Sequence, residues 1–151
     1  MIKISELLKI HKLKSKLEYI AEEIHRSARF GYNFSIIAIE FEKTLNNPDI
    51  KSSEQKLQFN MVKKHLRPYD QIINDEKDKY CIILPQTDGI GCSIVIDRVR
   101  ELCRNKQLNN ISFGTAIYPN DGTNANKLLN KAVERLKKFK DKNEDVPVEN
   151  S

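Results

Sequence analysis

The sequence predicts one α+β domain, with a mixed, mainly antiparallel central sheet and helices on both of its faces. Three observations lead to this prediction. The chain has 151 residues, which is the size of one domain with a proper hydrophobic core. Its apolar residues alternate along the chain between helical and strand-like spacing. Two strand-like runs between residues 71 and 84 flank a polar turn, and strands alternating with helices around such a hairpin fit this architecture.

Residues 5–29 are expected to form a long helix. Apolar side chains follow one another at steps of three and four residues and make one stripe, at Ile10, Leu13, Leu17, Ile20 and Ile24. Gly31 is a typical stop for such a helix. The stripe could pack on its own domain, or it could pair with a second copy as a short coiled coil and make the protein a homodimer.

A central strand and a second helix are expected next. Residues 34–41 (FSIIAIEF) form a nearly continuous apolar run, as in a strand that is covered on both faces. A polar connection with turn residues at 46–49 follows. Ser52 and Gln55 form a capping box, and the helix after them carries one apolar side, at Leu57, Met61, Val62 and Leu66.

The rest of the domain is predicted as a hairpin, a helix, a strand and a last helix. Residues 71–74 and 79–84 should pair antiparallel around a charged turn, because charged side chains are not buried without partners. A helix is expected to about residue 106, a strand over 111–118 and a helix over 124–140.

Residues 1–140 are therefore expected to form a single domain, with residues 1–30 as its N-terminal helix. Residues 141–151 have too little apolar content to pack and are predicted to be a flexible tail. No apolar run approaches the ~20 residues of a membrane span, and the first ten residues show no signal-peptide cleavage pattern. The sequence thus favours a cytoplasmic protein with no membrane association.

The three cysteines are predicted to be buried, reduced thiols. Cys81 lies inside an apolar strand, and Cys92 and Cys103 lie on one face of a predicted helix. No histidine or second cysteine stands at the spacing of metal ligands. The sequence therefore predicts neither a disulfide framework nor a metal site, and no cofactor is expected.

The net charge of +5 is unevenly distributed. Residues 127–142 contain seven basic and two acidic side chains, which could form a patch for phosphates or nucleic acid. Aromatic side chains do not alternate with these charges as they do in proteins that bind single strands. A solvated helix face is the preferred interpretation, and nucleic acid is not expected to be a partner.

Two patterns in the second half of the chain resemble the GGDEF (diguanylate cyclase) family. Residues 66–85 (LRPYDQIINDEKDKYCIILP) carry an Arg-x-x-Asp pair, a polar turn and an apolar strand that ends in proline. Residues 111–140 carry an S-x-G-x-A-x-Y-P strand and a helix that ends in lysine. The resemblance extends over about residues 13–140 and implies the palm-like fold that nucleotide cyclases share with polymerases.

In this alignment the signature Gly-Gly-Asp/Glu-Glu-Phe turn of the family is replaced by Glu76-Lys77-Asp78-Lys79-Tyr80. The two family glycines let the backbone approach the phosphates of GTP, whereas here side chains stand at those positions and one of them is anionic. Asp78 keeps a carboxylate of the type that binds metal in the family. We interpret the turn as vestigial and expect no catalytic residues.

Other positions related to catalysis also differ. Glu40 and Glu42 stand where the family has an Asp-x-Asp pair whose first member binds a divalent metal. Mg²⁺ requires near-ideal octahedral geometry at ~2.0–2.1 Å, so a longer side chain misplaces the ligand. We interpret Glu40 and Asp78 as a vestigial metal position, and expect Glu40 to meet solvent or a lysine. Lys140 matches a family lysine that reaches phosphate, whereas the family elements that hold guanine are missing.

Arg67 and Asp70, in contrast, keep the family's Arg-x-x-Asp spacing. The resemblance implies that this pair is a product-inhibition site for cyclic di-GMP. An arginine can donate two hydrogen bonds to guanine O6 and N7 or to a phosphate, and an aspartate can accept from the N–H edge of guanine. The structural alternative is an Arg–Asp ion pair at the start of a strand, worth ~0.2–1 kcal/mol if exposed.

These residues lead to one hypothesis with two alternatives. The preferred function is a catalytically inactive GGDEF-like signalling domain that binds cyclic di-GMP through Arg67 and Asp70 and regulates a partner protein. The first alternative is an interaction or dimerisation module that binds no nucleotide. An active diguanylate cyclase is the least favoured reading. The sequence does not identify the partner.

Overall fold

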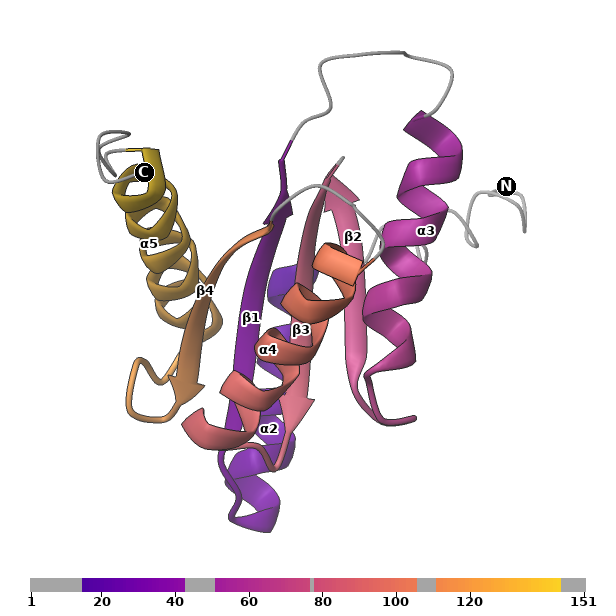
Figure 1. Ribbon diagram of the computed structural model, residues 1–151. Coiled ribbons are helices and arrows are strands. Elements are labelled where there is room, and N and C mark those ends of the chain that lie inside the picture. Colours follow the sequence, from indigo (N-terminus) through magenta and orange to yellow (C-terminus); the bar gives the residue numbers. More distant parts are fainter. Residues whose placement is uncertain (1–14, 43–50, 77, 106–110, 145–151) are drawn as a thin grey trace, which may run out of the picture.

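The computed structural model describes residues 15–42, 51–76, 78–105 and 111–144. Helices and strands alternate around one hairpin, in the predicted order (Figure 1): α2 (Lys16–Phe30), β1 (Phe34–Phe41), α3 (Lys51–Lys64), β2 (Gln71–Glu76), β3 (Lys79–Pro85), α4 (Gly89–Asn105), β4 (Ile111–Tyr118) and α5 (Ala125–Glu144). Among these residues, no helix combines the length and the apolar character that a membrane span requires.

The four described strands form one sheet in the order β2-β3-β1-β4. Every pairing in it is antiparallel, so the expected mixed character is not found in the described strands. The reason is topological. β1 and β2 run in the same direction, but β3 lies between them and pairs with both. The predicted hairpin is confirmed, because β2 and β3 pair antiparallel from Gln71 opposite Ile83 to Glu76 opposite Lys79.

Helices cover both faces of the sheet, as predicted. Alternate residues of β1 point to opposite faces, because the side-chain period of a strand is two. Ile37, Ile39 and Phe41 pack in a core with side chains of α3 and α4. Phe34 and Ile36 pack in a second core with side chains of α2 and α5. Figure 1 shows α4 in front of the sheet and α2 behind it.

The described part of the first helix agrees with the prediction. Ser15 caps α2 by accepting a hydrogen bond from the Glu18 N–H, and Gly31 ends the helix in a left-handed conformation with φ +71°. Ile20 is buried in the α2/α5 core and Ile24 packs against it, so this half of the apolar stripe packs on its own domain. Ile10 and Leu13 lie outside the described residues, and the coiled-coil alternative stays a prediction.

The last helix is longer than predicted. α5 continues to Glu144, four residues beyond the expected end at residue 140. Low apolar content in the sequence does not prevent helical hydrogen bonding, because the helix satisfies its own backbone groups, and lysine and glutamate, which occur in residues 141–144, are good helix formers. The expected tail therefore does not begin at residue 141, and residues 145–151 lie outside the described part of the chain.

All three cysteines are buried and free, as predicted. Burial raises the pKa of the Cys92 thiol to about 12 and that of the Cys103 thiol to about 11. Both groups are therefore protonated at neutral pH, and they act as small apolar side chains of the α3/α4 core.

Gly114 in β4 lets α5 lie directly on the sheet. A Cβ atom at this position would stand 2.0 Å from the Ala132 carbonyl oxygen and 2.3 Å from the Leu136 nitrogen, both in the backbone of α5. This close approach gives the glycine of the S-x-G-x-A-x-Y-P pattern a physical role.

We therefore predict that Gly114→Ala lowers the free energy of unfolding by about 3 kcal/mol or more, because a rigid helix backbone cannot yield as a side chain does. Urea denaturation measures the effect. Gly89→Ala is the matched control, because its Cβ would meet only the end of the Ile117 side chain, at 3.1 Å. Equal stability of the two variants would contradict the close packing of α5 on Gly114.

Candidate ligand-binding site

The turn between α3 and β2 places Arg67 and Asp70 side by side. Pro68 disfavours a helical conformation of Arg67, so the helix cannot continue through this turn. The Asp70 N–H donates to the Arg67 carbonyl oxygen at 3.0 Å, and the Arg67 N–H donates to Asp70 Oδ2 at 2.7 Å. One bond between backbone groups and one from the backbone to the Asp70 carboxylate thus hold the two residues together in the turn.

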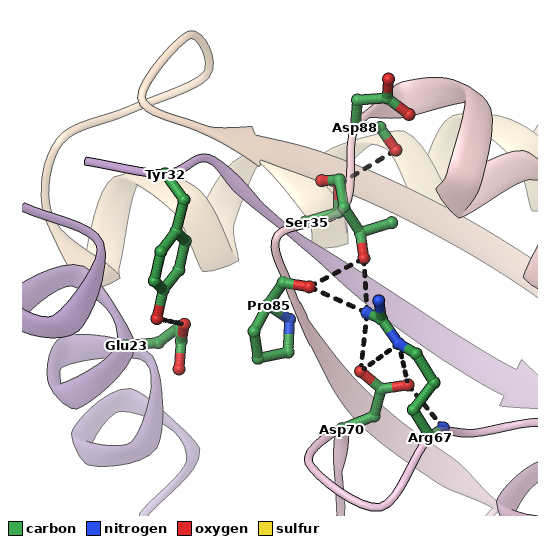
Figure 2. Close-up of polar contacts among 8 residues, drawn as sticks. Glu23, Tyr32, Ser35, Arg67, Asp70, Pro85 and Asp88 are labelled. Atoms are coloured by element: carbon green, nitrogen blue, oxygen red, sulfur yellow. Dashed lines mark hydrogen bonds and ion pairs between the residues drawn. The ribbon is translucent and has the colours of Figure 1, made fainter. Parts of the chain in front are cut away.

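The Arg67 guanidinium is fixed by four acceptor atoms (Figure 2). Its Nε lies 3.2 Å and 3.1 Å from the two Asp70 oxygens, and its Nη2 lies 2.9 Å from Asp70 Oδ1. Nη2 also donates to the Pro85 carbonyl oxygen at 2.8 Å and to Thr87 Oγ1 at 2.6 Å. The bonds to Asp70 raise the pKa of Arg67 above its usual value, so the group stays cationic.

The side chains of Arg67 and Asp70 differ in how far they are exposed to solvent, and this difference indicates their roles. The Asp70 side chain is only 2% exposed, whereas the Arg67 side chain is 39% exposed. Both carboxylate oxygens of Asp70 already accept hydrogen bonds from Arg67. Asp70 therefore orients the guanidinium, and Arg67 is the member of the pair that can meet a ligand.

The junction between β3 and α4 is the second anchor of this arrangement. The Thr87 hydroxyl donates to the Pro85 carbonyl oxygen at 3.0 Å, and Ser35 of β1 donates to the Thr87 carbonyl oxygen at 2.7 Å (Figure 2). Thr87 is 8% exposed and Ser35 is fully buried. Arg67 is thus bound to a segment that is itself fixed to the central strand.

A cavity of about 750 Å³ opens beside Arg67. This volume is within the range of small-molecule sites. Its walls come from four parts of the chain: the turn after α2, the turn after α3, the β3–α4 junction and the first half of α4. A second arginine, Arg98 of α4, lines the same cavity together with Thr87 and Ile94. The cavity therefore presents two guanidinium groups and an apolar wall.

His65 lines this cavity as a neutral imidazole. Burial lowers its pKa, and the charges of Arg98 and Lys64 lower the pKa further. Its Nε2 atom is buried and has no hydrogen-bond partner in the structure. At neutral pH the positive charge on the cavity wall therefore comes from the arginines and not from His65.

Tyr32 is held on the opposite wall of the cavity by a buried glutamate. The Tyr32 hydroxyl donates to Glu23 Oε2 at 2.6 Å (Figure 2). Arg26 donates to Glu23 Oε1 at 2.9 Å. Glu23 is only 1% exposed, so these bonds satisfy a carboxylate that water cannot reach. Burial, followed by the bond to Glu23, raises the pKa of Tyr32.

The residues of the expected vestigial metal position lie at the other end of β3. Glu40 at the end of β1 stands opposite Lys79 at the start of β3. Its Oε2 lies 2.5 Å from the Nζ of Lys140, and its Oε1 lies 3.8 Å from the Nζ of Lys79. The expected contact of Glu40 with a lysine is therefore confirmed, and Lys140 meets this carboxylate.

Asp78 takes up the hairpin turn with φ +62°, and its carbonyl oxygen accepts the Phe41 N–H at 2.8 Å. Burial raises the pKa of Tyr80, and the Asp78 charge adds to this shift. Glu76 is the exposed last residue of β2, and its Oε2 lies 3.2 Å from the Nζ of Lys79. Lys77 lies outside the described residues.

The structure thus joins Arg67 to Asp70, and joins Glu40 to Lys79 and Lys140, in two separate groups. Sequence reasoning missed Thr87 and Arg98. Thr87 follows the strand-ending proline by two residues, a weak signal for a loop that turns back on Arg67. Arg98 had no local signal, because an arginine on an amphipathic helix is ordinarily a solvated side chain.

Comparison with models of protein families finds one match. The family described as diguanylate cyclase, GGDEF domain, matches residues 56–145. The chain belongs to the GGDEF family. This match covers the Arg67 turn, the hairpin and both C-terminal helices, so the resemblance noted in the sequence is confirmed. No curated protein matches the sequence.

Solved structures of GGDEF domains share the fold. The active GGEEF domain of a diguanylate cyclase from Vibrio cholerae has a TM-score of 0.73 at 10% identity, over 83% of this chain and 88% of that one. The GGDEF domain of DgcB from Caulobacter crescentus, in complex with c-di-GMP, has a TM-score of 0.67 at 9% identity, over 84% and 81%.

A third solved structure is a diguanylate cyclase bound to a protein. SiaD from Pseudomonas aeruginosa, in complex with its activator SiaC, has a TM-score of 0.65 at 20% identity, over 83% of this chain and 53% of that one. At these identities the likeness shows the fold alone.

Proposed function

We propose that this GGDEF domain is a catalytically inactive receptor that binds cyclic di-GMP in the cavity beside Arg67 and passes the signal to a protein partner. The observation that carries the proposal is the Arg67 guanidinium, which is fixed by Asp70, Pro85 and Thr87 at the edge of a cavity of about 750 Å³. A guanidinium that is held in advance loses little conformational freedom on binding.

The chemistry of the cavity suits a cyclic dinucleotide. Cyclic di-GMP offers two phosphodiester anions and two guanine edges. Arg67 and Arg98 can each donate to a phosphate or to guanine O6 and N7. The apolar side of the cavity, which includes Ile94, offers a surface for the flat faces of the bases. The related domain of DgcB was solved in complex with c-di-GMP, and this supports the choice of ligand.

The other end of the sheet supports the proposal of inactivity. Glu76 stands at one of the family's glycine positions, and Lys79 replaces an acid of the signature turn. Lys79 and Lys140 both contact Glu40, so positive side chains lie beside the carboxylate that would face a metal. Chemistry on GTP would need these groups to rearrange together.

An interaction module that binds no nucleotide is the second candidate. The Nε and Nη2 atoms of Arg67 already donate to Asp70, Pro85 and Thr87 without a ligand, so the pair can also be a purely structural clamp. Large apolar side chains are also exposed near the cavity: Phe30 is 67% exposed, Ile90 is 75% exposed and Ile94 is 46% exposed. The complex of SiaD with SiaC illustrates a protein partner for a related enzyme.

Calorimetric titration with cyclic di-GMP separates the two candidates. We expect the wild type to bind, and Arg67→Ala to weaken binding ten- to a hundredfold, because a hydrogen bond to a charged group is worth about 1.5–3 kcal/mol. Arg98→Ala should also weaken binding. Asp70→Asn should weaken it indirectly, because the amide cannot hold the guanidinium as a carboxylate does.

Arg104→Ala is the matched control for this titration. Arg104 is an exposed arginine of α4, the helix that carries Arg98, and it does not line the cavity. The thermal unfolding of each variant is measured in parallel, so that only folded proteins are compared. Absence of heat at millimolar ligand, or equal binding by Arg67→Ala and the wild type, would reject the receptor and leave the interaction module.

The proposal also predicts that the domain does not synthesise cyclic di-GMP. Purified protein with GTP and Mg²⁺ or Mn²⁺ should form no cyclic di-GMP above a control without protein, because side chains replace the turn that approaches the phosphates. Chromatography of the nucleotides measures the product. Product that disappears in Asp78→Asn would show that the domain is an active cyclase; asparagine keeps the turn, because it tolerates positive φ.

A further inference from the structure

The end of β1 holds a cluster of charges that the receptor function does not use. Glu40 is the one acidic residue of β1, and its side chain is 15% exposed. Lys140 of α5 lies 2.5 Å from one of its oxygens, and Lys79 of β3 lies 3.8 Å from the other. The carboxylate is therefore flanked by two ammonium groups.

The fold places both lysines here. Lys79 is the direct cross-strand partner of Glu40, so the two side chains emerge on the same face of the sheet. This is the face that α2 and α5 cover, and α5 brings Lys140 over the end of β1. Lys79 also contacts Glu76 at 3.2 Å, and the bonds to Glu76 and Glu40 raise the pKa of Lys79. Lys79 therefore stays charged at neutral pH.

These residues do not fit the divalent metal of the family. Mg²⁺ takes several oxygen ligands in octahedral geometry, and Mn²⁺ likewise prefers carboxylates. The described part of the chain holds no cluster of three acidic, histidine or cysteine side chains that could bind a metal ion. The carboxylate that could bind one already faces the ammonium groups of Lys79 and Lys140.

We propose that the ammonium groups of Lys79 and Lys140 take the place of a divalent cation at Glu40 and keep such a cation out. Together they carry two positive charges, as many as the ion they replace. Their ion pairs also connect three elements, because Glu40 comes from β1, Lys79 from β3 and Lys140 from α5. The end of the sheet is thus neutralised by the chain itself, and no metal is required.

Titration with Mn²⁺, followed by the electron paramagnetic resonance of the free ion, tests this exclusion without nucleotide. We expect the wild type to leave the signal unchanged at millimolar protein. Lys79→Glu removes one ammonium and places a third carboxylate beside Glu40 and Glu76, so it should gain Mn²⁺ binding of at least about tenfold over the wild type. Adding Glu40→Gln to this variant should abolish the gain.

Lys138→Glu is the matched control, because it makes the same change of charge on α5 at a side chain that is 74% exposed and contacts Glu134 instead. If Lys79→Glu does not fold, the double variant Lys79→Gln, Lys140→Gln serves in its place, with the same expected gain. Binding of Mn²⁺ by the wild type that is lost in Glu40→Gln would overturn the proposal. So would a folded variant that gains nothing, because the lysines would then not be what excludes the metal. Either result is independent of cyclic di-GMP binding at Arg67.

Discussion

The pairing of β1 with strands on both of its edges is the constraint on which the rest of the structure depends. β1 pairs antiparallel with β3 on one side and with β4 on the other, and its residues from Phe34 to Ile39 are buried. Such a strand cannot shift by one residue without moving every side chain to the opposite face. Its register therefore fixes the positions of its two neighbours, and with them the polar groups around Arg67 and around Glu40.

These groups lie at opposite ends of β3 and differ in character. At the Pro85 end, a buried aspartate holds an arginine at the edge of a cavity that also contains Arg98. At the Lys79 end, a carboxylate faces two lysines of its own chain. The first arrangement leaves a cation partly exposed for an anionic ligand, whereas the second has already balanced its charge. The proposed receptor, with no chemistry at the hairpin, would account for both arrangements.

Much of this fold could be predicted from the sequence, and the reasons are local. The apolar run of residues 34–41 and the pattern of residues 111–118 gave strands with the observed bounds, because these segments are bounded by turn residues. The end of α5 could not be predicted from apolar content, since helical hydrogen bonds need no burial. The spacing in the sequence predicted that Arg67 and Asp70 lie together, but it also predicted that Asp70 would contact the ligand. Only the three-dimensional arrangement shows that both of its oxygens are used by Arg67, and that Thr87 and Arg98 come from distant segments.

The most direct test of the account is a map of where cyclic di-GMP acts on the folded domain. Two-dimensional ¹H–¹⁵N nuclear magnetic resonance spectra, recorded during a titration, report on each backbone amide separately. The account predicts that the amides of Arg67, Thr87 and Arg98 shift in a saturable way while those of Glu40, Lys79 and Lys140 keep their positions. Shifts centred on Glu40 and Lys79, or no shifts at millimolar ligand, would contradict it.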